Sequence, residues 1–172
     1  MNDITESEIL KLFKDMVIIV DTREQVGKNN HILDYFTKNG ITYVREKLDV
    51  GDYSYKFIAQ PELSKLYSVE RKKSLDEIAN NFGKERERFD REFERAKRQG
   101  IKMNLILENT SWTKLFNGSY RSQLHPNCIM ANLIRLDMLH DCPVYFCKPS
   151  ESGELIYNLI IWNTKRILKE RF

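Results

Sequence analysis

The sequence predicts an α/β fold in which a central mixed β-sheet is flanked by helices. Residues 16–20 form a wholly apolar run and residues 103–107 a mostly apolar one, and an acidic residue follows each of them. Runs of this kind are typical of strands that are buried on both faces. Between them lie segments with helical periodicity that stop at Gly40 and Gly100. Strands that alternate with helices pack into a layered α/β domain.

The other elements follow from the same patterns. Residues 5–14 carry apolar residues at helical spacing behind a Thr-x-x-Glu start, which predicts a short helix or a loosely held arm. Alternating apolar and polar residues predict strands at 43–44, 51–57 and 67–71, which we expect to form an antiparallel meander. Further patterns predict helices at 29–39, 74–81, 84–99, 129–139 and 154–169, and a strand at 144–147.

Length and composition restrict the class of protein. With 172 residues, 41% of them hydrophobic, the chain suits a single domain over residues 1–172, with residues 1–15 as a possible N-terminal arm. No apolar run approaches the roughly 20 residues of a membrane helix. The first residues include acids, whereas a signal peptide needs a basic start and an apolar stretch. We therefore expect a cytoplasmic protein that does not contact a membrane.

The cysteines and the net charge carry little functional information. Cys128, Cys142 and Cys147 are odd in number and lack CxxC spacing, which fits reduced thiols. His140 could join two of them at a zinc ion, but a fourth ligand at finger-like spacing is missing. A net charge of +3 does not by itself indicate a nucleic-acid-binding protein.

Ionisable residues lie at the ends of the predicted strands. Asp21 follows an apolar strand, Asp52 begins another, and Glu70 and Lys72 end a third. Ligand sites of open α/β sheets collect at strand ends. Carboxylates there can hold Mg²⁺ or Mn²⁺ for phosphodiester hydrolysis, with Lys72 orienting the attacking water. Glu70 and Lys72, two residues apart, should share one face of their strand.

Each of these features also has a structural explanation. An aspartate after a strand is often a helix cap or a loop residue, and Glu-Arg-Lys occurs on many solvated surfaces. The combination of acids and lysine is more informative than either part. A metal-free acid/base enzyme acting on a small substrate is a further alternative.

The motifs resemble those of the XPF-type structure-selective endonucleases (excision-repair cross-complementing group four). The resemblance rests on the segments Val-Asp-Thr-Arg-Glu (20–24), Val-Gly-Asp-Tyr (50–53) and Glu-Arg-Lys-x-x-x-Asp (70–76). It extends through Arg88-Phe89 and the strand that ends at Glu108.

The resemblance implies a restriction-endonuclease-like nuclease fold, dependence on Mg²⁺ or Mn²⁺, and cleavage of branched DNA. The positions that match the family's motif residues, and are therefore expected to be catalytic, are Asp21, Glu24, Asp52, Glu70, Arg71, Lys72 and Asp76. Asp52 and Glu70 are expected to bind the metal directly, with the Arg71 carbonyl as a further ligand, and Asp21 directly or through water. Lys72 would position or help to deprotonate the nucleophile. Arg71 and Asp76 could instead serve a structural ion pair.

The sequence also departs from the family. Larger relatives carry a C-terminal tandem helix-hairpin-helix domain, for which this chain has no room, and Val26 stands where an arginine is common. The chain looks more like the small single-domain members of bacteriophages and prokaryotic mobile elements. If it is phage-encoded, we expect it in the host cytoplasm.

Several segments are candidates for contact with DNA or a partner. Arg23 and Arg88 are expected at the phosphates, and the loop at 117–123 offers Ser119 and Arg121. Most other charges of residues 84–102 fit a solvated helix with paired charges. Residues 154–169 carry more apolar residues than one buried face of an amphipathic helix requires. That helix is therefore either buried on several sides within the fold or part of a homodimer interface.

The sequence thus favours a metal-dependent, structure-selective DNA endonuclease. Its substrates would be forks, flaps, D-loops or four-way (Holliday) junctions, processed during replication, recombination or repair. The alternative is a catalytically silent nuclease-fold module that binds DNA or a partner protein. Silent relatives lose some of the acids, but Asp21, Asp52 and Glu70 are all present here.

Overall fold

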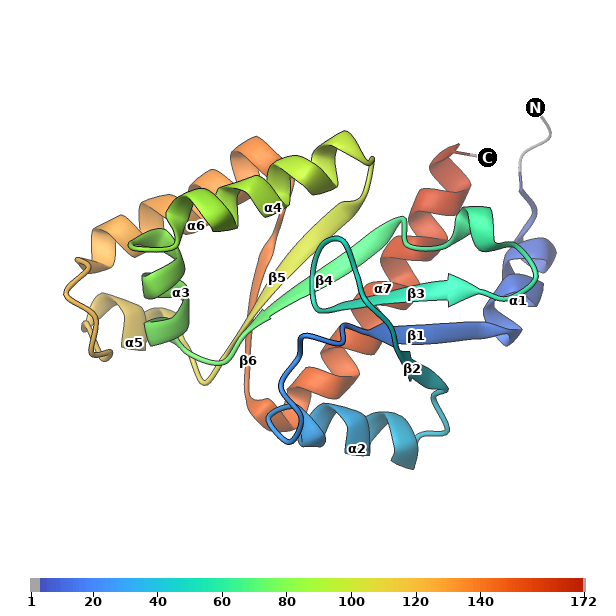
Figure 1. The fold of residues 1–172 in the computed structure, drawn as a ribbon, viewed down its shortest axis with the longest axis horizontal. Coiled ribbons are helices and arrows are strands. Elements are labelled where there is room, and N and C mark those ends of the chain that lie inside the picture. The colour runs from blue at the N-terminus through green and yellow to red at the C-terminus, as the bar shows by residue number, and fades with distance from the viewer. Residues whose placement is uncertain (1–3, 172) are drawn as a thin grey trace.

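A computed structural model describes residues 4–171 of the chain. Its centre is a six-stranded sheet with strand order β2-β1-β3-β4-β5-β6 (Figure 1). The strands are β1 (Met16–Val20), β2 (Tyr43–Arg45), β3 (Tyr53–Phe57), β4 (Tyr67–Lys72), β5 (Lys102–Glu108) and β6 (Val144–Cys147). The helices are α1 (Glu6–Lys14), α2 (Asn30–Lys38), the 3-10 turn η1 (Pro61–Leu63), α3 (Leu75–Phe82), α4 (Arg86–Arg98), α5 (Trp112–Phe116), α6 (Pro126–His140) and α7 (Pro149–Arg171).

The sheet is mixed, as predicted, but the expected meander is wrong. β3 pairs antiparallel with β4, whereas β2 lies on the far side of β1 and runs parallel to it. β1 therefore lies between β2 and β3. The crossover through α2 brings the chain back in the direction of β1, so that β2 can only join as a parallel strand at the sheet edge.

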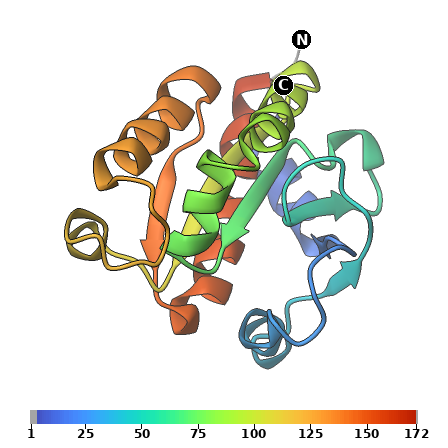
Figure 2. The same cartoon turned by 60° about the vertical axis from the view of Figure 1, so that its left-hand side comes forward.

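Helices cover both faces of the sheet (Figures 1 and 2). One core contains Ile18, Phe36, Tyr55 and Ile160 and lies between the sheet and the helices α2 and α7. The other contains Ile78, Phe93, Leu105 and Leu133 and lies under α3, α4 and α6. The restriction-endonuclease-like nuclease fold expected from the resemblance is present, and its central strands are buried on both faces.

Capping residues and prolines explain where several of the helices begin. Thr5 and Glu8 form the capping box that begins α1, as the Thr-x-x-Glu pattern predicts. α6 begins three residues before the predicted start, with Pro126 in its first turn. The sequence analysis did not predict α5, because a helix of one to two turns is too short to show a hydrophobic periodicity. At its start, the Ser111 side chain accepts a hydrogen bond from the Lys114 N–H.

The closing helix is longer than predicted, and most of its apolar residues are clasped inside the fold. Ile156, Ile160 and Leu168 of α7 are fully buried, whereas Trp162 is 63% exposed. Of the two explanations for its composition, the structure favours burial. No helix within residues 4–171 is long and apolar enough to cross a membrane.

Candidate active site

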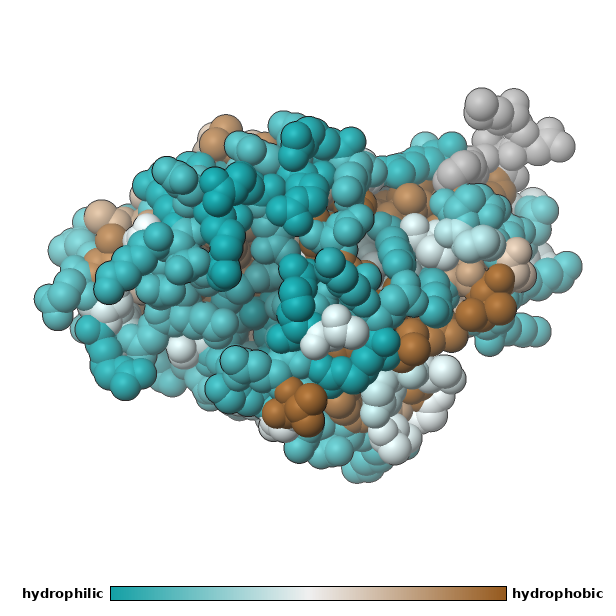
Figure 3. Space-filling view, in the orientation of Figure 1, coloured by the Kyte–Doolittle hydropathy of each residue, from teal (hydrophilic) through white to brown (hydrophobic). Residues whose placement is uncertain are grey.

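A groove of about 580 Å³ opens where the 48–52 loop, the end of β4 and the helices α3 and α4 meet. This face of the molecule is predominantly hydrophilic (Figure 3). The lining residues are mostly charged: Arg23, Glu24, Gln25, Asp52, Glu70, Arg71, Lys72, Lys73, Glu77, Asn81, Arg88, Phe89, Glu92 and Arg95. Of the predicted site residues, the groove therefore brings together Arg23, Glu24, Asp52, Glu70, Arg71, Lys72 and Arg88.

A tight turn places Asp52 in the groove. Gly51 has φ 73°, and a Cβ at this position would lie 2.2 Å from Ser68 Oγ. Only glycine fits such a left-handed, close-packed position. The Asp52 N–H then donates to the Val69 carbonyl oxygen (2.9 Å), and its carboxylate accepts from the Arg71 N–H (2.8 Å). The Gly-Asp motif thus fixes one carboxylate beside the neighbouring strand β4.

Alternation along β4 separates its three motif residues. The side chains of Glu70 and Lys72 meet on the groove face, where Lys72 Nζ donates to Glu70 Oε1. Lys72 also lies over the Phe89 ring, 5.3 Å from its centroid. The intervening Arg71 points to the opposite face, because successive side chains of a strand alternate. The i, i+2 prediction for Glu70 and Lys72 is confirmed.

The two groove carboxylates are electrostatically unfavourable neighbours. Burial raises the pKa of Asp52 well above its usual range, and the Glu70 charge adds to the rise. Burial likewise raises the pKa of Glu70 to about 7, although Lys72 opposes the shift. Both shifts arise because negative charge is crowded in a desolvated place, and an added cation would relieve them.

Asp21 lies behind the groove and is engaged by other partners. Its carboxylate accepts hydrogen bonds from the Arg23 N–H and guanidinium and from the Leu48 N–H. Burial opposes ionisation here, but the Arg23 contacts outweigh it and lower the pKa of Asp21. Asp21 is therefore a neighbour of Asp52, because its N–H donates to the Asp52 carbonyl oxygen (2.8 Å), but it does not line the groove. Its carboxylate anchors Arg23, which does line the groove.

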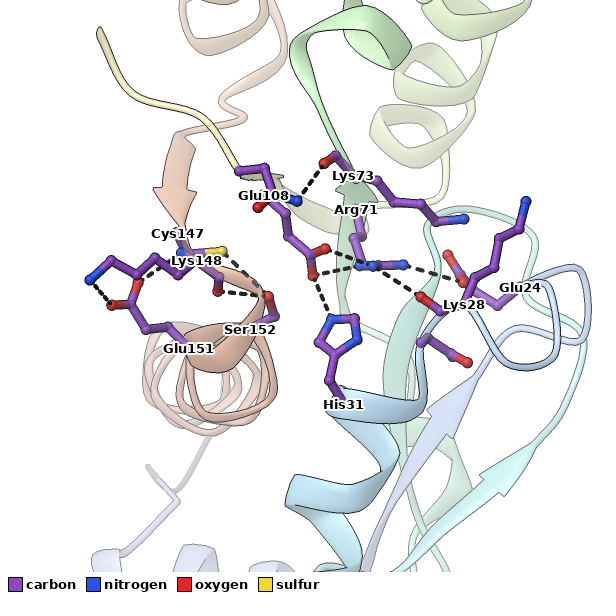
Figure 4. Close-up of polar contacts among 12 residues, drawn as sticks. Glu24, Lys28, His31, Arg71, Lys73, Glu108, Cys147, Lys148, Glu151 and Ser152 are labelled. Carbon is purple, nitrogen blue, oxygen red and sulfur yellow. Dashed lines mark hydrogen bonds and ion pairs between the residues drawn. The ribbon is translucent and has the colours of Figure 1, made fainter. Parts of the chain in front are cut away.

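Arg71 belongs to a buried polar network on the α2 and α7 side of the sheet (Figure 4). Its guanidinium makes a two-pronged contact with Glu108, at 2.7 Å for both Nε–Oε1 and Nη2–Oε2. His31 Nε2 lies 3.0 Å from Glu108 Oε1, and Arg71 Nη1 lies 3.6 Å from Glu24 Oε2. Burial alone would raise the pKa of Glu108, but Arg71 and His31 hold it at about 2. Arg71 therefore carries a structural ion pair whose partner is Glu108.

Asp76 lies in the first turn of α3 and does not line the groove. Its carboxylate accepts a hydrogen bond from the Arg121 N–H (2.6 Å) and lies 3.3 Å from Arg121 Nε. The backbone hydrogen bond lowers the pKa of Asp76, against a small opposing effect of burial. Asp76 thus ties α3 to the loop that carries Ser119 and Arg121, and both of those residues are exposed.

The sequence-based prediction missed several groove residues. Glu92 Oε1 accepts from the Gly51 N–H (2.9 Å), and Arg95 Nη1 donates to the Asp49 carbonyl oxygen (2.9 Å). α4 therefore holds the turn that presents Asp52. These residues follow Arg88 at helical spacing and share its face of α4, a signal that the mixed charges around them conceal.

A known family model matches this sequence. The model of the ERCC4 domain matches residues 20–159, more than half of the chain. The chain belongs to the ERCC4 domain family. This confirms the family indicated by the motifs, since the matched range contains all the predicted site residues.

Solved structures agree with the ERCC4 assignment. XPF from Aeropyrum pernix in complex with DNA superposes with a TM-score of 0.63 at 18% identity, covering 87% of this chain and 66% of that chain. XPF from the same organism without DNA gives a TM-score of 0.61 at 18% identity, covering 86% of this chain and 61% of that chain. This chain thus spans about two thirds or less of these XPF chains. Comparison with curated protein sequences gives no match.

Proposed function

We propose that this ERCC4 domain is a metal-dependent, structure-selective DNA endonuclease that hydrolyses phosphodiester bonds in branched DNA. The observation that carries the proposal is the meeting of Asp52, Glu70 and Lys72 in one groove. The rim of that groove carries Arg23 and Arg88, with side chains 56% and 75% exposed. Exposed guanidinium groups beside buried acids suit a phosphodiester, because the arginines bind the phosphate and the acids hold a cation.

The donor set fits Mg²⁺ or Mn²⁺. Within residues 4–171, no group of three or more His, Cys, Asp or Glu side chains is placed to hold a metal ion. Mg²⁺ commonly binds proteins through one or two carboxylates and keeps several waters or substrate oxygens. Asp52 and Glu70, with the Arg71 carbonyl, would supply hard oxygen ligands of this kind, and the crowding of their negative charge, which raises both pKa values, supports a cation there. When bound, the cation supplies charge for the phosphate and makes water a better nucleophile.

The other residues have positioning and binding roles. Lys72, buried and held by Glu70, would orient the attacking water and stabilise negative charge on the phosphate. The Arg71 N–H holds the Asp52 carboxylate, and the Glu108 pair holds Arg71. Asp21 would hold Arg23 at the groove, and any contact of Asp21 with the metal would run through water, because its oxygens already accept several hydrogen bonds.

The substrates proposed are forks, flaps, D-loops or four-way junctions, cut during replication, recombination or repair. Glu24 and Asp76 would act indirectly, Glu24 through the Arg71 network and Asp76 through the 117–123 loop. We also propose that the protein is encoded by a phage or a mobile element and acts in the host cytoplasm.

Cleavage of labelled DNA tests the proposal. Splayed-arm, flap, fork and four-way-junction DNAs are incubated with the protein in Mg²⁺, Mn²⁺ or EDTA. Asp52→Asn and Glu70→Gln are expected to abolish cutting, whereas Glu62→Gln, an exposed acid outside the groove, should cut like the wild type. Binding without cutting in every metal would identify the domain as a catalytically silent DNA-binding module. Cutting in EDTA that persists in Asp52→Asn would refute the metal mechanism.

We also propose that the domain acts as a homodimer, which suits two nicks on a two-fold symmetric junction. α6 exposes Ile134 (51%), Met138 (79%) and Leu139 (55%), which are candidates for the shared surface because α7 is mostly buried. Light scattering with and without junction DNA checks the mass. A monomer under both conditions would exclude the dimer and leave room for a replication or recombination partner protein.

A further inference from the structure

Two exposed aromatic side chains on α5 lie next to each other, outside the groove lining. The rings of Trp112 and Phe116 lie 6.0 Å apart with an interplanar angle of 23°. Trp112 is 46% exposed and Phe116 59% exposed, so a large part of each ring faces solvent. Trp112 also packs against Phe146 of the edge strand β6, with ring centroids 4.6 Å apart, which fixes its orientation. Trp112 and Phe116 therefore form an aromatic platform, and the contact with Phe146 keeps the Trp112 ring in place.

The surrounding sequence is free of negative charge. Asp and Glu make up 25 of the 172 residues, yet none occurs between residues 109 and 136. The same segment contains Lys114, Arg121 and Arg135. Arg135 pairs with Asp90, whereas the Arg121 side chain, although it lies 3.3 Å from Asp76, is 92% exposed. A segment without acids in a chain of 31% charged residues is suited to a polyanion.

The platform is connected to the groove. The Arg121 N–H donates to Asp76 at the start of α3, a helix that also supplies Glu77 and Asn81 to the groove. On the other side, the Ser119 N–H donates to the Lys114 carbonyl oxygen, which ties the same loop to α5 (2.9 Å). The loop that carries Arg121 therefore joins the start of α3, a helix that lines the groove, to α5, which carries the two rings.

We propose that Trp112 and Phe116 form a binding site for unpaired nucleotides, in which bases stack on the rings and Arg121 holds a phosphate. Aromatic stacking combined with positive charge binds single-stranded DNA with little sequence preference, because every base has a π-face. The site rests on the proposed function, and it supplies what a structure-selective nuclease needs, a place for the single strand at a branch point. A paired duplex keeps its bases stacked inside and cannot use it.

Tryptophan fluorescence tests this site directly. The chain has two tryptophans, and Trp162→Phe leaves Trp112 as the reporter. Oligothymidylate in EDTA, where no cutting is expected, should quench the emission of this variant, and a blunt duplex of equal length should quench it less. The complementary variant Trp112→Phe, which reports from Trp162 on α7, should show no quenching.

Two further variants separate stacking from charge. Phe116→Ala, at an exposed position, should weaken oligothymidylate binding by about 5-fold or more while leaving the circular dichroism unchanged. Arg121→Gln should lower the slope of log K against log salt by about 0.7, the value for one lost phosphate contact on a single strand. Unchanged affinity in Phe116→Ala, or equal quenching by duplex and single strand, would overturn the site.

Fluorescence quenching and DNA cleavage test the binding site and the nuclease activity separately. Quenching without cleavage would refute the endonuclease and keep the binding site, whereas cleavage without quenching would do the opposite. Trp112 emission that shifts with protein concentration alone, together with a doubled mass, would show that a second copy covers the rings and would overturn the site as well.

Discussion

The Arg71–Glu108 pair offers a sharp test of how the domain holds its site. Glu108 is 1% exposed and Arg71 is 3% exposed. The variant Glu108→Gln keeps the shape of the side chain but leaves the Arg71 guanidinium buried without its main counter-charge. Removing one partner of a buried, hydrogen-bonded ion pair costs about 3–5 kcal/mol, because the desolvation of the other charge is no longer offset.

The pKa of Glu108 gives an independent magnitude. It lies at about 2 in the folded protein, against 4.5 for an ordinary glutamate. At about 1.4 kcal/mol per pKa unit, this difference corresponds to roughly 3 kcal/mol of folding free energy. Glu108→Gln should therefore lower the free energy of unfolding at pH 7 by roughly 3 kcal/mol.

Urea unfolding, followed by circular dichroism, measures this loss. Glu46→Gln is the matched control, since Glu46 pairs with Lys56 and Lys65 at the surface. Exposed pairs contribute only up to about 1 kcal/mol. A loss in Glu108→Gln no larger than that of the control would refute the reasoning and would indicate that Arg71 finds another counter-charge, such as Glu24.

The remaining predictions concern pH, the Gly-Asp turn and the metal site. Because its folded pKa is lowered, Glu108 stabilises the fold fully above pH 4.5 and loses this effect as the pH falls toward 2, so the difference in unfolding free energy between wild type and Glu108→Gln should close over that window. Gly51→Ala should lower the free energy of unfolding in urea by about 2 kcal/mol or more, because the new Cβ would clash with Ser68 Oγ. Gly40→Ala, also at positive φ but with nothing within 4 Å of its Cβ, should lower it by about 1 kcal/mol. Equal losses in the two variants would contradict the steric argument. Asp52→Asn should raise the melting temperature of the metal-free protein, because it removes a desolvated charge. In a thermal shift assay, Mn²⁺ should raise the melting temperature of the wild type but not that of Asp52→Asn. An undiminished Mn²⁺ effect in the variant would exclude Asp52 as a ligand.

The class of fold and the shared strand face of Glu70 and Lys72 follow from local sequence patterns alone. An apolar run such as residues 105–107 is stable where both faces of the strand are covered, so it predicts a central strand without tertiary information. The i, i+2 spacing of Glu70 and Lys72 places both on one face because the strand period is 2. Local chemistry likewise set the beginning of α1 through Thr5 and its capping box.

Strand neighbours and charge partners, in contrast, depend on how distant parts of the chain pack together. β2 joins β1 rather than β3, because strand pairing depends on the path of the crossover through α2 and not on the residues of β2. The same holds for the charges: Asp21 is engaged by Arg23, and Arg71 pairs with Glu108, 37 residues away in sequence. A buried charge needs whichever opposite charge the fold brings within reach, and that distance is set by packing rather than by sequence spacing.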